Sequence, residues 1–173
     1  MAASSSQKSN SKKQKVINLE HYVPGYLTWI SNKLSSGASQ AYLSTFSIGI
    51  ETWRLLVLLA SDGTLSAPVA CKVIGMDKAS VSRCFKTMQQ DGLITMSLDD
   101  SDGRLRIANL TAKGRKIHDQ ILGLALERER ALLEVLNDKE QETLVQLLAR
   151  IHENLPTVES ATENYIRKNF KNK

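Results

Sequence analysis

The sequence contains few of the residues and patterns on which metal sites, nucleotide-binding loops and membrane spans depend. Its three histidines, His21, His118 and His152, are isolated, and no pair has the spacing that binds zinc on one helix. Neither cysteine, Cys71 or Cys84, has a histidine nearby, and no glycine-rich phosphate loop is present. No apolar run approaches the roughly 18 residues that a membrane span requires. We therefore expect a protein without a metal, a cofactor or a membrane contact.

Acidic residues are in the minority. The 23 lysines and arginines exceed the 18 acidic residues, which gives a formal net charge of +5 and a pI near 9.2. This balance suits a polyanionic partner. The excess gathers near the two ends, at Lys8, Lys12, Lys13, Lys15, Arg167, Lys168, Lys171 and Lys173. Because the first residues lack the hydrophobic core of a signal peptide, we expect a cytoplasmic protein with reduced cysteines.

Residues 75–111 carry the strongest local pattern in the chain. The spacing predicts a helix over 77–90, which Asp77 or Ser80 can cap and Asp91-Gly92 can end. Four apolar residues recur at helical spacing and form one stripe: Val81, Cys84, Phe85 and Met88. The other face offers cations and small hydroxyls: Lys78, Ser80, Ser82, Arg83, Lys86 and Thr87. Such a helix can act as a recognition helix, which enters a DNA major groove. Its cations would contact the phosphates, and Arg83 would contact base edges.

A hairpin is predicted directly after this helix. Residues 93–98 and 105–110 are apolar-rich and compatible with β-strands, and the polar turn between them carries Asp102 and Arg104. An arginine at the tip of such a wing can insert into a minor groove, where the charge of the phosphates is focused. The alternative is an ordinary amphipathic helix followed by an ordinary hairpin.

These motifs resemble the winged helix of the MarR family of bacterial transcription regulators. The family pattern is a D-K-x-[ST]-V-[ST]-R helix, a K/D-G-L-[IV] exit and a D-x-R wing followed by L-T-x-x-G. The chain matches it at residues 77–83, 91–94, 102–104 and 110–114, and the resemblance extends over roughly residues 20–155. It departs at Gly103 and at Met96-Ser97, where the family often has basic residues.

The chain divides into five predicted segments. They are a disordered basic arm over 1–17, an N-terminal dimerisation helix over 18–48, a winged helix-turn-helix over 49–111, C-terminal dimerisation helices over 112–156 and a basic tail over 157–173. The fold class is therefore mainly α with a small β-hairpin wing.

Several local signals mark the predicted helix ends. The first helix is expected to break near residues 35–37. Ser66 begins the helix before the recognition helix, with Pro68 in its first turn. Asn137 and Glu140 form a capping box, and Pro156 ends the last helix.

The outer helices carry wide apolar stripes that a winged core cannot cover. Exposing them would cost roughly 25 cal/mol per Å², so we expect a twofold homodimer, as the resemblance also implies. Its two recognition helices would face successive major grooves of a palindromic operator. The alternative is an intramolecular bundle in one protomer.

An effector site is expected among the few aromatic residues. MarR-like proteins commonly lose DNA affinity when they bind small anionic aromatic compounds, and the resemblance implies the same here. Trp29 and Trp53 could stack on a planar ligand beside Tyr26, while His21 or Arg54 could meet a carboxylate. The alternative is that these residues serve core packing and structural pairing.

We therefore predict a sequence-specific DNA-binding repressor, released from its operator by an aromatic carboxylate or its thioester. The predicted DNA contacts are Ser66, Lys78, Ser80, Ser82, Arg83, Lys86, Asp102 and Arg104. One alternative is a regulator that senses oxidants through Cys71, since Cys84 lies on the buried stripe. Alternatives from other classes are an acyl-transfer enzyme and a pure dimerisation module.

Overall fold

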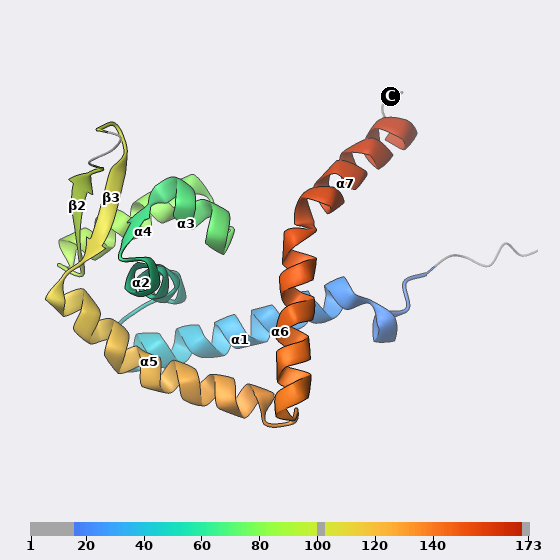
Figure 1. Ribbon diagram of the computed structural model, residues 1–173, viewed down its shortest axis with the longest axis horizontal. Coiled ribbons are helices and arrows are strands. Elements are labelled where there is room, and N and C mark those ends of the chain that lie inside the picture. Colours follow the sequence, from blue (N-terminus) through green and yellow to red (C-terminus); the bar gives the residue numbers. More distant parts are fainter. Residues whose placement is uncertain (1–15, 100–102, 171–173) are drawn as a thin grey trace, which may run out of the picture. The chain divides into compact units, whose positions relative to one another are not determined.

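The computed structural model describes residues 16–99 and 103–170. In these residues the chain forms seven α-helices, one 3-10 helix and three short β-strands, which confirms the predicted fold class (Figure 1). The chain divides into two compact units, residues 1–118 and 119–173, and the boundary falls within helix α5 (Ala112–Leu133). Residues 1–15 lie outside the described residues, and with them most of the predicted basic arm.

Helix α1 (Val23–Phe46) is continuous, so the predicted break near residues 35–37 is wrong. It follows a short 3-10 helix, η1 (Leu19–His21). Ser35 accepts a hydrogen bond from the Arg54 guanidinium of α2 (Ile50–Asp62) over 2.9 Å, and Tyr42 is buried further along α1. Gly37 costs a helix interior only about 1 kcal/mol, and these contacts hold α1 on both sides of it.

Helices α3 (Ala67–Ile74) and α4 (Lys78–Gln90) form the predicted helix-turn-helix, and α2 precedes them. Gly63 and Gly75 end α2 and α3 with positive φ angles, a conformation that costs glycine little. Pro68 lies in the first turn of α3, as predicted. The buried side chains of the three helices include Leu55, Leu56, Leu59, Ala70, Val81, Phe85 and Met88.

The wing is the hairpin of β2 (Ile94–Leu98) and β3 (Arg106–Leu110), and both strands match the prediction to within one residue (Figure 1). A third strand, β1 (Thr64–Ser66), was not predicted. It pairs antiparallel with β3, so that the strand order is β1-β3-β2. Leu65 of β1 faces Ala108 of β3, and both are buried. This pairing fastens the wing to the helix-turn-helix.

The start of α5 is fixed against the start of the wing. The Thr111 amide donates to the Leu93 carbonyl over 3.0 Å, and the Thr111 hydroxyl donates to the Gly92 carbonyl over 2.7 Å. The same hydroxyl accepts a hydrogen bond from the Gly114 amide over 3.0 Å and so caps the first turn of α5. The wing therefore leads into α5 through a hydrogen-bonded junction rather than a loose linker.

The second unit contains the rest of α5 together with α6 (Asp138–Glu153) and α7 (Leu155–Phe170). The predicted capping box is confirmed, because Asn137 accepts from the Glu140 amide and Glu140 accepts from the Asn137 amide. The chain after Pro156 was predicted to be a tail beyond the last helix, and this is wrong for residues 157–170. Pro156 lies in the first turn of α7. Proline is tolerated there because backbone amides in the first turn have no hydrogen-bond partner within the helix.

The described residues contain no single helix that is long and apolar enough to cross a membrane. Helices α1 and α2 pass this test only when taken together across a bend of 84°, and then by length and composition alone.

Candidate nucleic-acid interface

Helix α4 has one buried face and one solvent-exposed basic face. Val81, Phe85 and Met88 are buried in the first unit. Lys78, Ser82, Arg83 and Lys86 are exposed, and Ser80 is half-buried. The predicted amphipathic pattern is therefore observed except at Cys84, which was predicted to be buried and is half-buried. The exposed face carries three cations and no carboxylate after the capping residue Asp77.

A chain of hydrogen bonds orients Arg83. The Ser80 amide donates to Asp77 Oδ1 over 2.9 Å, and the Ser80 hydroxyl donates to Asp77 Oδ2 over 2.6 Å. The Arg83 guanidinium in turn donates to Ser80 Oγ over 2.9 Å. The hydroxyl hydrogen bond from Ser80, followed by its amide hydrogen bond, lowers the pKa of the Asp77 carboxyl from its ordinary value. An ionised Asp77 thus holds Ser80, and Ser80 holds the base-reading candidate Arg83.

The wing presents Arg104 to solvent beside its turn. The Asp99 amide donates to the Leu105 carbonyl over 2.8 Å and closes the hairpin. Asp102 lies outside the described residues, so its predicted contact with DNA remains a prediction.

Ser66 does not lie on this surface. It is 6% exposed, precedes the first turn of α3 and pairs with Ile107 of β3. Ser66 is buried because it belongs to strand β1, which was not predicted from the sequence and which pairs with β3. We therefore leave Ser66 out of the proposed contact surface.

A basic groove of about 330 Å³ lies between α4 and the wing. Its lining residues are Ala67, Ser82, Phe85, Lys86, Gln89, Met96 and Arg106. Arg106 was not among the predicted contacts. The sequence offers one signal for Arg106, because it lies two residues after the predicted contact Arg104 and should share its face of a strand. The strand register was needed to show which face of the hairpin that is.

Residues 47–105 match the model of the MarR family. The structure of a MarR/EmrR family transcriptional regulator from Acinetobacter sp. ADP1 is 30% identical, with a TM-score of 0.75 over 82% of this chain and 99% of that chain. The chain belongs to the MarR family. The predicted family resemblance is thereby confirmed.

The chain is also similar to two other bacterial proteins. YdgJ of Bacillus subtilis, described as an uncharacterized HTH-type transcriptional regulator, is 28% identical over 110 residues, which cover 62% of this chain and 65% of YdgJ. The chain thus spans less than two thirds of the length of that relative. The fold is also that of S. aureus MepR, solved as a DNA complex, with 24% identity and a TM-score of 0.68 over 79% of this chain and 98% of that chain.

MarR-family members are transcriptional regulators and not enzymes, so the acyl-transfer alternative is set aside. The thiol chemistry of Cys84 agrees with this. Burial, followed by a hydrogen bond to Glu51 Oε2 over 3.5 Å, raises the pKa of the Cys84 thiol to about 11. A thiol that stays protonated near neutral pH is a poor nucleophile. Cys71 on α3 is half-buried.

The residues predicted to bind an effector of this MarR-family protein differ in their exposure to solvent. Trp53 is only 8% exposed, and its ring stacks on His118 at 5.4 Å and meets Tyr42 edge-on at 5.7 Å. The Arg54 guanidinium donates a hydrogen bond to Ser35 Oγ over 2.9 Å. For Trp53 and Arg54 the packing alternative therefore describes what is observed.

The remaining effector candidates lie at the surface near the start of α1. Tyr26 is 47% exposed and Trp29 is 43% exposed, and their rings meet edge-on at 5.6 Å. His21 is exposed, and its Nδ1 lies 3.2 Å from the Asn18 side-chain amide. These three residues keep the chemistry predicted for them, an aromatic face and an ionisable ring.

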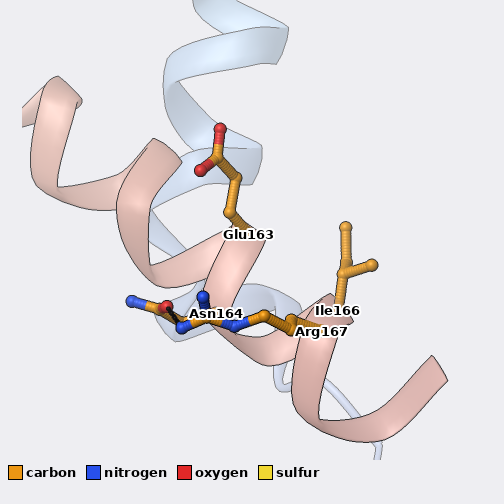
Figure 2. Close-up of a pocket in the computed structure, with 4 residues that line it drawn as sticks. All are labelled: Glu163, Asn164, Ile166 and Arg167. Atoms are coloured by element: carbon orange, nitrogen blue, oxygen red, sulfur yellow. Dashed lines mark hydrogen bonds between the residues drawn. The ribbon is translucent and has the colours of Figure 1, made fainter. Parts of the chain in front are cut away.

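Figure 2 shows a second hollow, of about 240 Å³, on helix α7. Glu163, Asn164, Ile166 and Arg167 line it, and Arg167 donates to Asn164 Oδ1 over 2.7 Å. The Glu163 carboxylate points away from that pair (Figure 2). Because all four residues come from one helix, this hollow is a surface feature of α7 and we assign it no function.

Proposed function

We propose that this MarR-family protein is a sequence-specific DNA-binding transcriptional regulator, with α4 in the major groove and the wing at the minor groove. The observation that carries the proposal is the basic exposed face of α4, on which Asp77 and Ser80 hold Arg83 in place. A long arginine reads guanine edges best when its geometry is set in advance. The DNA complex of MepR, which shares the fold, supports the same role for this chain.

We further propose that two copies of the chain bind DNA together as a homodimer. Helices α6 and α7 contain no buried residue in the single chain. A row of apolar residues along them is 40–50% exposed, namely Leu147, Leu148, Ile151, Leu155, Val158 and Ile166. Covering such a row stabilises a protein by roughly 25 cal/mol per Å² of apolar area. A second copy supplies the same row by symmetry, which favours it as the cover.

The proposal predicts salt-dependent and sequence-specific binding to duplex DNA. Selection from a random duplex library should recover a palindrome whose half-sites lie about one helical turn apart, with two chains bound per duplex. The logarithm of affinity should fall linearly with the logarithm of salt concentration. A scrambled duplex of equal length is the control. Equal binding to the two duplexes would overturn sequence-specific recognition, and no binding at low salt would favour a pure dimerisation module.

For the regulation of this activity, we propose a cytoplasmic repressor that an aromatic carboxylate or its thioester releases from the operator. Tyr26 and Trp29 offer exposed aromatic faces for such a ligand, and His21 offers a partner for its carboxylate. The ligand must bind the DNA-free state more tightly than the DNA-bound state. A release of about 100-fold requires a difference of about 2.7 kcal/mol between the two.

The effector proposal predicts that an aromatic carboxylate quenches tryptophan fluorescence and releases operator over the same concentration range. Trp29→Leu should blunt both responses while DNA binding stays within a few fold, because Trp29 is exposed and lies outside the winged helix. Tyr165→Leu, which removes an exposed aromatic ring from α7, is the matched control and should respond as the unmodified protein does. If a panel of aromatic acids and thioesters has no effect while peroxide releases DNA through Cys71, the thiol alternative replaces this one.

A further inference from the structure

We propose that Lys86 of α4 and Arg106 of β3 together bind one backbone phosphate of the duplex, in the groove between the recognition helix and the wing. This inference rests on the proposed DNA-binding function and adds a phosphate anchor to it. Three separate elements build the groove, since Ala67 comes from α3, the residues between Ser82 and Gln89 come from α4, and Met96 and Arg106 come from the wing.

Strand register explains why Arg106 faces the groove. In the antiparallel wing, Arg106 is opposite Leu98, and Met96 is opposite Ala108. Side chains alternate between the two faces of a strand, so Arg106 shares one face of the hairpin with Met96 and the buried Ala108. Met96 and Arg106 accordingly line the same groove.

The positive charge of the groove favours the binding of an anion. Its lining includes two cations and no carboxylate. Within residues 16–99 and 103–170, the side chains of Lys86 and Arg106 form no hydrogen bond or ion pair. Two uncompensated cations in one groove repel each other, and an anion between them turns this repulsion into two attractions. The Ser82 hydroxyl and the Gln89 amide are neutral donors beside them.

The position of the groove favours a backbone phosphate over a base. The N-terminal part of a recognition helix meets base edges, and here that part carries Ser80 and Arg83. Lys86 and Gln89 lie one to two turns further along α4, beside the wing. Strand β2 has no basic residue, so Arg106 of β3 provides the positive charge of the two wing strands beside α4. Contacts of this kind position a protein on the duplex without reading sequence.

The test compares four variants at a series of salt concentrations, on the selected operator and on an unrelated duplex. Arg106→Gln should weaken binding to both duplexes on the order of tenfold and lower the salt slope by about one per protomer. Lys86→Gln should do the same. The double variant should lose less than the sum of the two single losses, because both side chains hold the same phosphate. Arg106→Lys should restore most of the slope.

Lys33→Gln on α1 is the matched control, since it removes one exposed positive charge outside the winged helix. Thermal unfolding of each variant checks that the wing remains folded. An Arg106→Gln protein that matches the control in affinity and slope overturns the inference while leaving the proposed function intact. Fully additive losses overturn the shared phosphate. If the unmodified protein binds neither duplex, the proposed function fails, and the inference fails with it.

Discussion

Replacement of Gly114 by alanine is expected to lower the free energy of unfolding by about 1–3 kcal/mol, the usual cost of overpacking a tight site. A Cβ atom at this position would collide with the backbone carbonyl oxygen of Leu93 and would lie 3.0 Å from Leu110 Cδ2. A backbone carbonyl cannot rotate aside as a side chain can. The same carbonyl accepts the hydrogen bond from the Thr111 amide, so moving it would open the junction between the wing and α5.

Denaturant unfolding of the protein measures this effect. Gly123→Ala is the matched control, because it makes the same change in the same helix where an added Cβ meets nothing within 4 Å. It should raise the free energy of unfolding by about 0.5–1 kcal/mol through helix propensity alone. An unchanged unfolding midpoint for Gly114→Ala would show that the junction can open without cost.

The parts of the fold that the sequence predicted well are those set by residues close together in the chain. Asp77 caps α4 through an amide three residues away, and the Asn137–Glu140 box closes over the same spacing. Asp91 and Gly92 end α4 as predicted, and Gly92 has a positive φ angle. Such signals need no knowledge of tertiary structure, which is why the recognition helix and the wing strands were located to within one residue.

The missed elements depend on residues far apart in the chain. Strand β1 has three residues, too few for an alternating pattern, and it exists because β3 pairs with it more than 40 residues later. Helix α1 stays continuous across residues 35–37 with the help of a hydrogen bond from Arg54. Pro156 was interpreted as the end of the helical region although it is equally suited to the first turn of α7.

The residues of the candidate site also fall into two groups, those that local sequence patterns predict and those that depend on distant parts of the chain. The exposed residues of α4 follow from helical periodicity, and the structure places Lys78, Ser82, Arg83 and Lys86 at the surface. Burial of Ser66 and Trp53 follows instead from partners on β3 and α5, which no local pattern reveals. The groove position of Arg106 follows from strand register. Periodicity therefore predicted which face of a helix is available, but not which residues other elements cover or bring to it.

Arg83→Ala is expected to weaken operator binding by about 1–3 kcal/mol per half-site and to relax the preference at one base position in each half-site. The reason is the arrangement on α4, where the Arg83 guanidinium already donates to Ser80 Oγ, which Asp77 holds in turn. The entropy of ordering a long side chain is thus partly lost before DNA binds, so most of the contact energy contributes to discrimination. Competition of the operator against single-base variants measures both effects.

Lys86→Ala separates sequence reading from charge. Lys86 lies one turn after Arg83 on the same exposed face. Its replacement should weaken binding to all duplexes alike and lower the salt slope by about one per protomer, without changing base preference. Arg83→Lys keeps the charge but loses the planar fork, so it should resemble Arg83→Ala in base preference and the unmodified protein in salt slope. If Arg83→Ala binds the operator as tightly and as selectively as the unmodified protein, α4 is not the element that reads the sequence. In that case the ordered Asp77–Ser80–Arg83 chain serves only the cap of the helix.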